Sequence, residues 1–291
     1  MSTLHKLIFG NSMDMSEIRD ESVQLIVTSP PYFNAPFDYE GLFGSYEEYL
    51  DMLECVAKES YRVLSEGRIF ALNIDDILVD GKRYSIVADA TRIFQNVGFN
   101  YRDRIIWKKP DGYLRISRRS GVLLQNPYPM YFYPDNLLEN IIIFQKGKFD
   151  YKSISKEIRE QSKIDINEFQ KNNWYKTIWE MTNVLPNSIL EKNIAAFPEE
   201  LPYRLIKLYS YVGETVLDPF LGSGTTMKVA RQLKRNSIGI EIIRDLEKII
   251  RKKIGFDADM NIFNQDDKLE IIIRNIDNYK SFTIEFSDKE K

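Results

Sequence analysis

The segment Thr28-Ser29-Pro30-Pro31-Tyr32 places a hydroxyl group, two rigid prolines and an aromatic ring directly after the apolar run at residues 23–27. Proline restricts φ and so fixes the Pro30 carbonyl, while the Ser29 hydroxyl can accept a hydrogen bond. Two fixed acceptors could pull the hydrogens of an exocyclic amine out of the plane of its ring and free the nitrogen lone pair. Tyr32 could stack on the base that carries this amine once that base has left its duplex. These residues suit the activation of an aromatic amine, although an ordinary proline turn at a strand end would use the same types.

A second segment has the residues of a cofactor-binding turn. It follows the strand expected at residues 215–217, precedes the helix expected at 225–233, and reads Asp218-Pro219-Phe220-Leu221-Gly222-Ser223-Gly224-Thr225-Thr226. Glycines let the backbone approach a ligand closely, and a helix N-terminus offers free N–H groups. Glu241 closes the next expected strand roughly 20 residues beyond Gly222, where an acid can accept hydrogen bonds from ribose hydroxyls.

This turn carries no lysine in the position that a phosphate-binding P-loop requires. The expected ligand is therefore a nucleoside cofactor with little phosphate. The alternative is a glycine turn that serves only the packing of the helix against the strand.

The elements that position these segments alternate along the chain. Strands are predicted at 23–27, 68–74, 101–107, 140–144, 215–217 and 237–240, and helices at 45–64, 84–97, 201–211 and 225–233. Two further β segments are predicted at 269–274 and 282–286. This alternation predicts an α/β fold with a doubly wound, mostly parallel sheet and helices on both faces.

Composition excludes several classes of protein. The 291 residues are 43% hydrophobic and 29% charged, which favours a globular domain with a substantial core. Cys55 and His5 are the only cysteine and histidine, so we expect no internal disulfide, no metal site of the usual zinc type and no histidine-based triad beyond His5. Cys55 itself is expected to be packed within its helix. No apolar run is long enough for a membrane span and no secretory leader is present, so a cytoplasmic protein is expected.

The formal net charge of −3 does not by itself indicate a nucleic-acid partner. Positive charge is instead concentrated between residues 102 and 119, where seven basic residues face two acids: Arg102, Arg104, Lys108, Lys109, Arg115, Arg118 and Arg119 against Asp103 and Asp111. Such a stretch is either a solvated face or a phosphate-binding surface.

Taken together, the two segments resemble the β-type amino-methyltransferases of bacterial and archaeal restriction–modification systems, in which a Ser/Asp-Pro-Pro-Tyr motif precedes the cofactor motif. The resemblance covers most of residues 7–245. It extends to the segments at 9–11, 20–23, 62–74, 105–108, 138–146 and 197–206.

The resemblance implies that the cofactor is S-adenosyl-L-methionine and that the segment Phe197–Pro202 closes around its methionine moiety. The implied catalytic residues are Ser29, Pro30, Pro31 and Tyr32. The implied cofactor-binding residues are Asn11, Thr28, Phe197, Pro198, Leu201, Asp218, Pro219, Phe220, Gly222, Ser223, Gly224, Thr225, Thr226 and Glu241. Two positions depart from the family pattern, since Asn11 replaces a common acid and Asn193 replaces a common histidine.

The resemblance also divides the chain. Residues 1–147 are expected to form the catalytic part, 148–190 a target-recognition insertion, 191–256 the cofactor-binding part, and 257–291 an extension of unknown role. The implied partner is double-stranded DNA, with Arg115, Arg118 and Arg119 on its phosphates. A companion restriction endonuclease is a possible further partner, and the chain is expected to be a monomer or a homodimer.

The family associates Ser29, in place of Asp, with cytosine N4 as the methylated atom, and adenine N6 is the alternative. A C5-cytosine enzyme would need a Pro-Cys nucleophile, which Cys55 does not provide. An RNA methyltransferase, an inactive DNA-binding module and an NAD-binding or other nucleotide-binding Rossmann protein remain as alternatives. The last rests on Gly222, Gly224 and Glu241 and leaves residues 28–32 and 197–202 unexplained.

Overall fold

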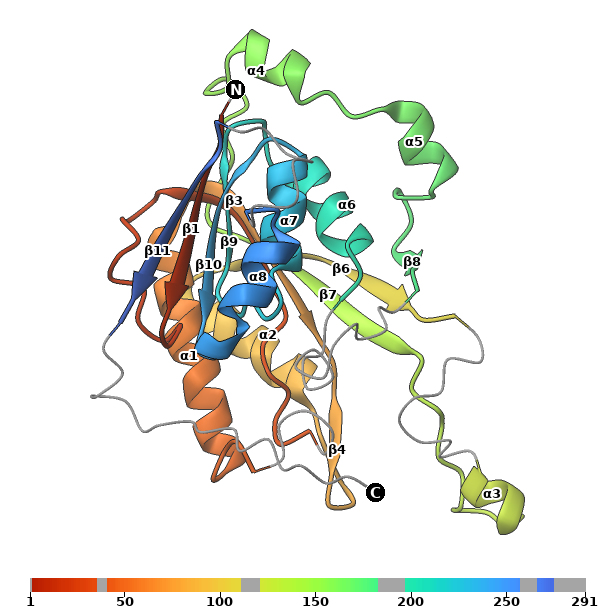
Figure 1. Ribbon diagram of the computed structural model, residues 1–291. Helices are drawn as coiled ribbons and strands as arrows, with labels where there is room; N and C mark the ends of the chain where they lie inside the picture. The colour runs from red at the N-terminus through yellow and green to blue at the C-terminus, as the bar shows by residue number, and fades with distance from the viewer. Residues whose placement is uncertain (1, 36–40, 111–120, 183–196, 257–265, 275–291) are drawn as a thin grey trace.

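A nine-stranded sheet forms the centre of the molecule (Figure 1), in a computed structural model that describes residues 2–35, 41–110, 121–182, 197–256 and 266–274. The strand order is β11-β1-β10-β9-β2-β3-β7-β6-β8. The strands are β1 (Leu4–Phe9), β2 (Val23–Thr28), β3 (Leu64–Ile74), β6 (Asn100–Lys108), β7 (Leu138–Gln145), β8 (Ile178–Glu180), β9 (Thr215–Asp218), β10 (Asn236–Glu241) and β11 (Lys268–Ile273). A separate hairpin pairs β4 (Ile77–Val79) with β5 (Lys82–Tyr84). Neighbouring strands run parallel throughout except at β7, which is antiparallel to both β3 and β6.

Helices cover both faces of this sheet, as predicted. The helices are α1 (Tyr46–Val63), α2 (Ile86–Val97), α3 (Gly121–Gln125), α4 (Lys156–Gln161), α5 (Ile166–Lys171), α6 (Glu200–Tyr209), α7 (Thr225–Gln232) and α8 (Glu247–Lys253). Helices α1 and α2 pack on one face, whereas α6 and α7 pack on the other. No helix in the described part of the chain is long and apolar enough to span a membrane.

The alternation of side chains along β2 shows how the two faces are filled. Leu25 and Val27 point toward α6, while Ile26 points toward the cluster beneath α1 and α2. All three are almost fully buried. A strand that is apolar on both sides belongs in the middle of a sheet covered on both faces, which is where β2 lies.

Local signals set the helix boundaries. The Ser45 hydroxyl accepts a hydrogen bond of 3.1 Å from the Glu48 backbone N–H at the start of α1, which satisfies one of the donors left free at a helix N-terminus. Gly98, with φ of 123°, ends α2, because glycine adopts positive φ without a steric penalty. The predicted ends of both helices therefore lie within two residues of the observed ones.

The structure bears on three further predictions. The prediction of Cys55 as a packed helix residue is wrong, because Cys55 is exposed; it lies off the apolar stripe that buries Leu53 and Val56. The polar interval after β7 holds two short helices, α4 and α5. The predicted strand at 269–274 is present as β11, while the one at 282–286 lies outside the described residues.

The paths of the chain through the sheet create a crevice. From β2 the chain passes through α1 to β3 on one side, and from β9 it passes through α7 to β10 on the other side. Strands β2 and β9 are adjacent, pairing Leu25 with Val216 and Ile26 with Leu217. The crevice outside the carboxyl ends of such a pair is the usual ligand site of an open α/β sheet.

Gly67 of β3 offers a test of the packing at the opposite, amino edge of the sheet. Its φ is 77°, and a Cβ atom there would lie 2.4 Å from the Phe149 Cα atom. Gly67→Ala should lower the free energy of unfolding by about 2–5 kcal/mol, since it combines left-handed strain with overlap against fixed backbone. Gly81→Ala is the matched control, because Gly81 has φ of 78° with no described atom within 4 Å of the added Cβ. Urea denaturation of both variants measures the difference, and equal losses would contradict the overlap.

Candidate active site

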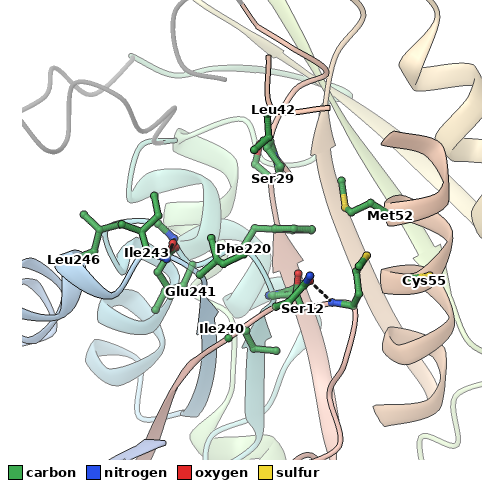
Figure 2. A pocket seen from close by; sticks show the side chains of 18 of the residues that line it. Ser12, Ser29, Leu42, Met52, Cys55, Phe220, Ile240, Glu241, Ile243 and Leu246 are labelled. Atoms are coloured by element: carbon green, nitrogen blue, oxygen red, sulfur yellow. Dashed lines mark hydrogen bonds between the residues drawn. The ribbon is translucent and has the colours of Figure 1, made fainter. Parts of the chain in front are cut away.

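A cavity of about 360 Å³ occupies the crevice at the carboxyl ends of β1, β2, β9 and β10. Its wall is formed by two strand-to-helix loops, by α1 and by the loop after β10 (Figure 2). Figure 2 shows Met52 and Cys55 of α1 facing Phe220 and Glu241 across the cavity, with Ser29 at one end. The lining residues are Gly10, Asn11, Ser12, Met13, Ser29, Pro31, Leu42, Phe43, Glu48, Asp51, Met52, Cys55, Phe197, Pro219, Phe220, Leu221, Gly222, Ser223, Thr225, Ile240, Glu241, Ile242, Ile243 and Leu246.

Asp218 ties the two loops together from behind this wall. Its carboxylate accepts hydrogen bonds from the Thr28 hydroxyl at 2.7 Å, from the Thr226 hydroxyl at 2.6 Å and from the Phe220 backbone N–H at 3.1 Å. Burial raises the pKa of Asp218 to about 6, although these hydrogen bonds act in the opposite direction. The proline loop and the glycine loop are thus held in one fixed arrangement.

Glu241 closes the glycine-rich side. One carboxylate oxygen accepts a hydrogen bond of 2.7 Å from the Gly222 backbone N–H, and the other accepts one of 2.8 Å from the Ile243 backbone N–H. Burial raises the pKa of this carboxyl group to about 7. Each oxygen retains lone pairs for a ligand hydroxyl, so the carboxylate can act as an acceptor inside the cavity.

This pKa predicts a pH dependence of ligand binding. If the ionised Glu241 accepts ribose hydroxyls, the affinity for the nucleoside cofactor expected from the sequence should rise about tenfold between pH 6 and pH 8, as the carboxyl group loses its proton. The raised pKa also affects the stability of the ligand-free protein. The contribution of Glu241 to the free energy of unfolding is largest at pH values below the ordinary pKa of a glutamate, and it decreases as pH rises to about 7. Calorimetric titration of wild type and Glu241→Gln at several pH values measures the effect. A variant that keeps the wild-type pH profile would contradict the assignment to Glu241.

A polar cluster adjoins Ser29 at the other end of the cavity. Asn73 of β3 donates through Nδ2 to Ser29 Oγ at 3.4 Å and to Glu139 Oε2 at 2.6 Å. Glu139 of β7 also forms an ion pair of 2.6 Å with Lys109. Asn73 is 3% exposed, and its Oδ1 atom has no hydrogen-bond partner among the described residues. The cluster therefore offers an unused acceptor beside the Ser29 hydroxyl.

Tyr32 belongs to the same cluster. Its hydroxyl donates to Glu139 Oε2 at 3.2 Å. Burial and the neighbouring Glu139 carboxylate raise the pKa of the Tyr32 phenol well above its ordinary value. The phenol therefore stays protonated, and its hydrogen bond to Glu139 fixes the direction of the ring.

The predicted site residues fall into three groups. Those that line the cavity are Asn11, Ser29, Pro31, Phe197, Pro219, Phe220, Gly222, Ser223, Thr225 and Glu241. Those that stand outside the lining are Thr28, Pro30, Tyr32, Pro198, Leu201, Asp218, Gly224 and Thr226. Arg115, Arg118 and Arg119 lie outside the described residues.

The sequence analysis did not predict the wall of the cavity that α1 forms. Glu48, Asp51, Met52 and Cys55 of α1 line it together. Their spacing of three, four and seven residues places them along one helical stripe. The sequence contains this stripe, but the apolar stripe of the same helix, which includes Leu53, is the stronger periodic signal. Leu42 and Phe43, in the loop before α1, were also missed.

Comparison with known proteins gives this site its family. The family model described as DNA methylase, which covers N6 and N4 amino-methyltransferases, matches residues 23–252. That range includes the proline loop, the glycine loop and Glu241. The chain therefore belongs to the N6/N4 DNA methylase family.

Two similar proteins come from archaea. The type II methyltransferase M.MjaI of Methanocaldococcus jannaschii is 36% identical over 288 residues, covering 88% of this chain and 92% of that protein. The type II methyltransferase M.MthZI of Methanothermobacter thermautotrophicus is 33% identical over 316 residues, covering 99% of this chain and 85% of that protein.

Solved structures show the same fold. A putative DNA modification methylase from Thermus thermophilus, solved in complex with S-adenosyl-L-methionine, superposes with a TM-score of 0.71 at 26% identity over 93% of this chain and 99% of that one. The PvuII DNA methyltransferase, which is cytosine-N4-specific, superposes with a TM-score of 0.62 at 18% identity over 92% of this chain and 96% of that one. The sheet and helices are those of S-adenosylmethionine-dependent methyltransferases.

Proposed function

We propose that this DNA methyltransferase transfers a methyl group to the exocyclic N4 of a cytosine that has been flipped out of double-stranded DNA. One observation carries the proposal: Ser29 lies where the cofactor cavity meets the polar cluster of Asn73 and Glu139. A base inserted beside this cluster brings its amine to the Ser29 hydroxyl. The neutral serine, in place of an aspartate, favours cytosine N4 over adenine N6.

S-adenosylmethionine is the methyl donor: when bound, its sulfonium would supply a methyl carbon that the amine nitrogen attacks in line, so that the C–N bond forms as the C–S bond breaks and S-adenosylhomocysteine leaves. The protein positions and polarises the reactants. Ser29 Oγ and the Pro30 carbonyl accept hydrogen bonds from the amine and direct its lone pair toward the methyl group. The proton that the methylated nitrogen sheds passes to water, so no strongly basic side chain is required.

In this proposal different cavity residues bind different parts of the cofactor. Glu241 accepts hydrogen bonds from the ribose hydroxyls. The apolar surfaces of Phe220 and Ile243, beside Glu241 in Figure 2, contact the adenine ring. Phe197 lines the part of the cavity assigned to the methionine moiety. The hydrogen bond between Thr28 and Asp218 holds the proline loop, beside the base, and the glycine loop, beside the cofactor, in one fixed arrangement.

The biological setting is inferred from the relatives. Both archaeal relatives carry the name of type II methyltransferases. By analogy, this chain would work in a restriction–modification system with a companion endonuclease as partner. The methylation would protect the sites that this endonuclease cuts.

Mass spectrometry of nucleosides tests the target base. Purified protein, S-adenosylmethionine and genomic DNA should yield N4-methylcytosine. N6-methyladenine as the sole product would replace cytosine by adenine in the proposal, and activity on RNA alone would overturn the DNA assignment. Thermal shifts with NAD but none with S-adenosylmethionine would point to a nucleotide-binding Rossmann protein instead.

A further inference from the structure

The segment between β6 and β7 extends from the body of the protein with an unusually apolar surface. We name its described residues, 121–138, the β6–β7 arm; it carries α3 and runs into β7 (Figure 1). Eight of the sixteen exposed large hydrophobic side chains of the described residues belong to this arm: Val122, Leu124, Tyr128, Met130, Tyr131, Phe132, Tyr133 and Leu138. Met130 is 90% exposed and Phe132 is 66% exposed. Contiguous exposed apolar side chains of this kind mark an interaction surface.

The root of the arm stands beside the catalytic loop. Its Leu137 carbonyl accepts a hydrogen bond of 2.8 Å from the Lys109 backbone N–H, and Asn136 donates to Asp75, which follows β3. The next residue after the arm is Glu139, which bonds both Asn73 and Tyr32. A ligand whose reacting base lies at Ser29 must therefore pass close to the arm.

Helix α4, in the insertion expected at 148–190, lies at the amino ends of the sheet strands. Ser162, at the end of α4, accepts a hydrogen bond of 2.8 Å from the Val212 N–H, just before β9 begins. Glu168 of α5 forms an ion pair of 2.8 Å with Lys207 on α6. Helix α4 therefore lies away from the carboxyl ends of β2 and β3, where the base would be held at Ser29.

We infer that the β6–β7 arm contacts the DNA duplex on the flanks of the flipped base; this inference rests on the proposed function. Charge favours DNA over a second copy of the chain. Asp135 is the only charged residue within the arm. Lys108 and Lys109, which precede the arm, form ion pairs with Glu180 and Glu139, and the sequence at 110–120 adds three arginines and one aspartate. Aromatic and thioether side chains next to basic residues suit stacking and wedging against bases.

Paired variants test the arm. Met130→Ala combined with Phe132→Ala should weaken binding of a duplex oligonucleotide by about tenfold or more, since each stacked contact contributes substantially to affinity. The dissociation constant for S-adenosylmethionine and the melting temperature should not change, because both side chains are largely exposed. Tyr151→Ala combined with Ile166→Ala is the matched control, as these residues are 69% and 57% exposed and lie in the expected insertion outside the arm. That control should bind the duplex as wild type does.

Fluorescence anisotropy with labelled duplex, sedimentation velocity and the nucleoside assay are run on the same preparations. Unchanged duplex affinity in the arm variant overturns the inference, as does a loss confined to the insertion control. A wild-type dimer that the arm substitutions convert to a monomer assigns the arm to a second copy and also overturns it. A wild type that binds duplex through the arm but methylates no cytosine refutes the proposed target and leaves the arm contact standing, so the two failures are distinguishable.

Discussion

Replacement of Ser29 by alanine should lower kcat about 10²–10³-fold, while the dissociation constant for S-adenosylmethionine changes by less than about threefold. In the proposed mechanism the hydroxyl is one of two acceptors that draw the amine hydrogens out of plane, and this interaction strengthens only as the nitrogen becomes the nucleophile. The Ser29 side chain lines one end of the cavity, opposite the Glu241 carboxylate assigned to the ribose. The loss should therefore fall on chemistry and not on cofactor binding.

Single-turnover transfer of a labelled methyl group measures the chemical step, and calorimetry measures cofactor binding. Ser29→Thr is the conservative control, because it retains the hydroxyl and should recover most of the lost rate. Asn73→Ala adds a second comparison, since it removes the 3.4 Å donor to Ser29 and the unused Oδ1 acceptor together. Abolished cofactor binding with intact transfer at saturating cofactor would refute the role assigned to Ser29.

Replacement of Asp218 by alanine should lower the free energy of unfolding by about 2–4 kcal/mol and weaken cofactor binding at the same time. The change strips an acceptor from two buried hydroxyls, Thr28 and Thr226, and from the Phe220 N–H. Buried donors without partners each cost about 1–3 kcal/mol. The glycine loop and the proline loop would also lose their shared anchor.

Asp218→Asn is the matched control, because it keeps the size of the side chain and one acceptor oxygen. Burial raises the pKa of Asp218 to about 6, so the ionised carboxylate is disfavoured in the fold and stability falls as pH rises from the ordinary range to about 6. The asparagine variant lacks this decline and should gain on wild type above pH 6. Denaturant titrations at pH 5 and pH 7.5 measure both effects, and an alanine variant as stable as wild type would show that the loops hold without Asp218.

The sequence alone predicted the order of the long core elements, because strands and helices have distinct periodicities that neighbouring residues reveal. The short strands β4, β5 and β8 and the helices α3, α4, α5 and α8 were not predicted. The apolar run at 23–27 and the capped helix after Ser45 stand where those patterns placed them. The glycine turn with Glu241 was also visible, since its residues lie close together in the chain. The predicted burial of Cys55 was wrong because Cys55 lies outside the apolar stripe of its helix, on a second stripe that also contains Met52 and lines the cavity.

Only the tertiary structure could decide which distant residues meet. The hydrogen bond between Thr28 and Asp218 joins residues 190 positions apart, and no local pattern encodes the pairing of β2 with β9 that brings them together. The same holds for Glu139, which lies close to Tyr32 because its strand β7 pairs antiparallel with β3. The residue types of Ser29 to Tyr32 were thus enough to suggest their chemistry. The residues that contact this loop depend on strand order, which is set by packing across the whole sheet.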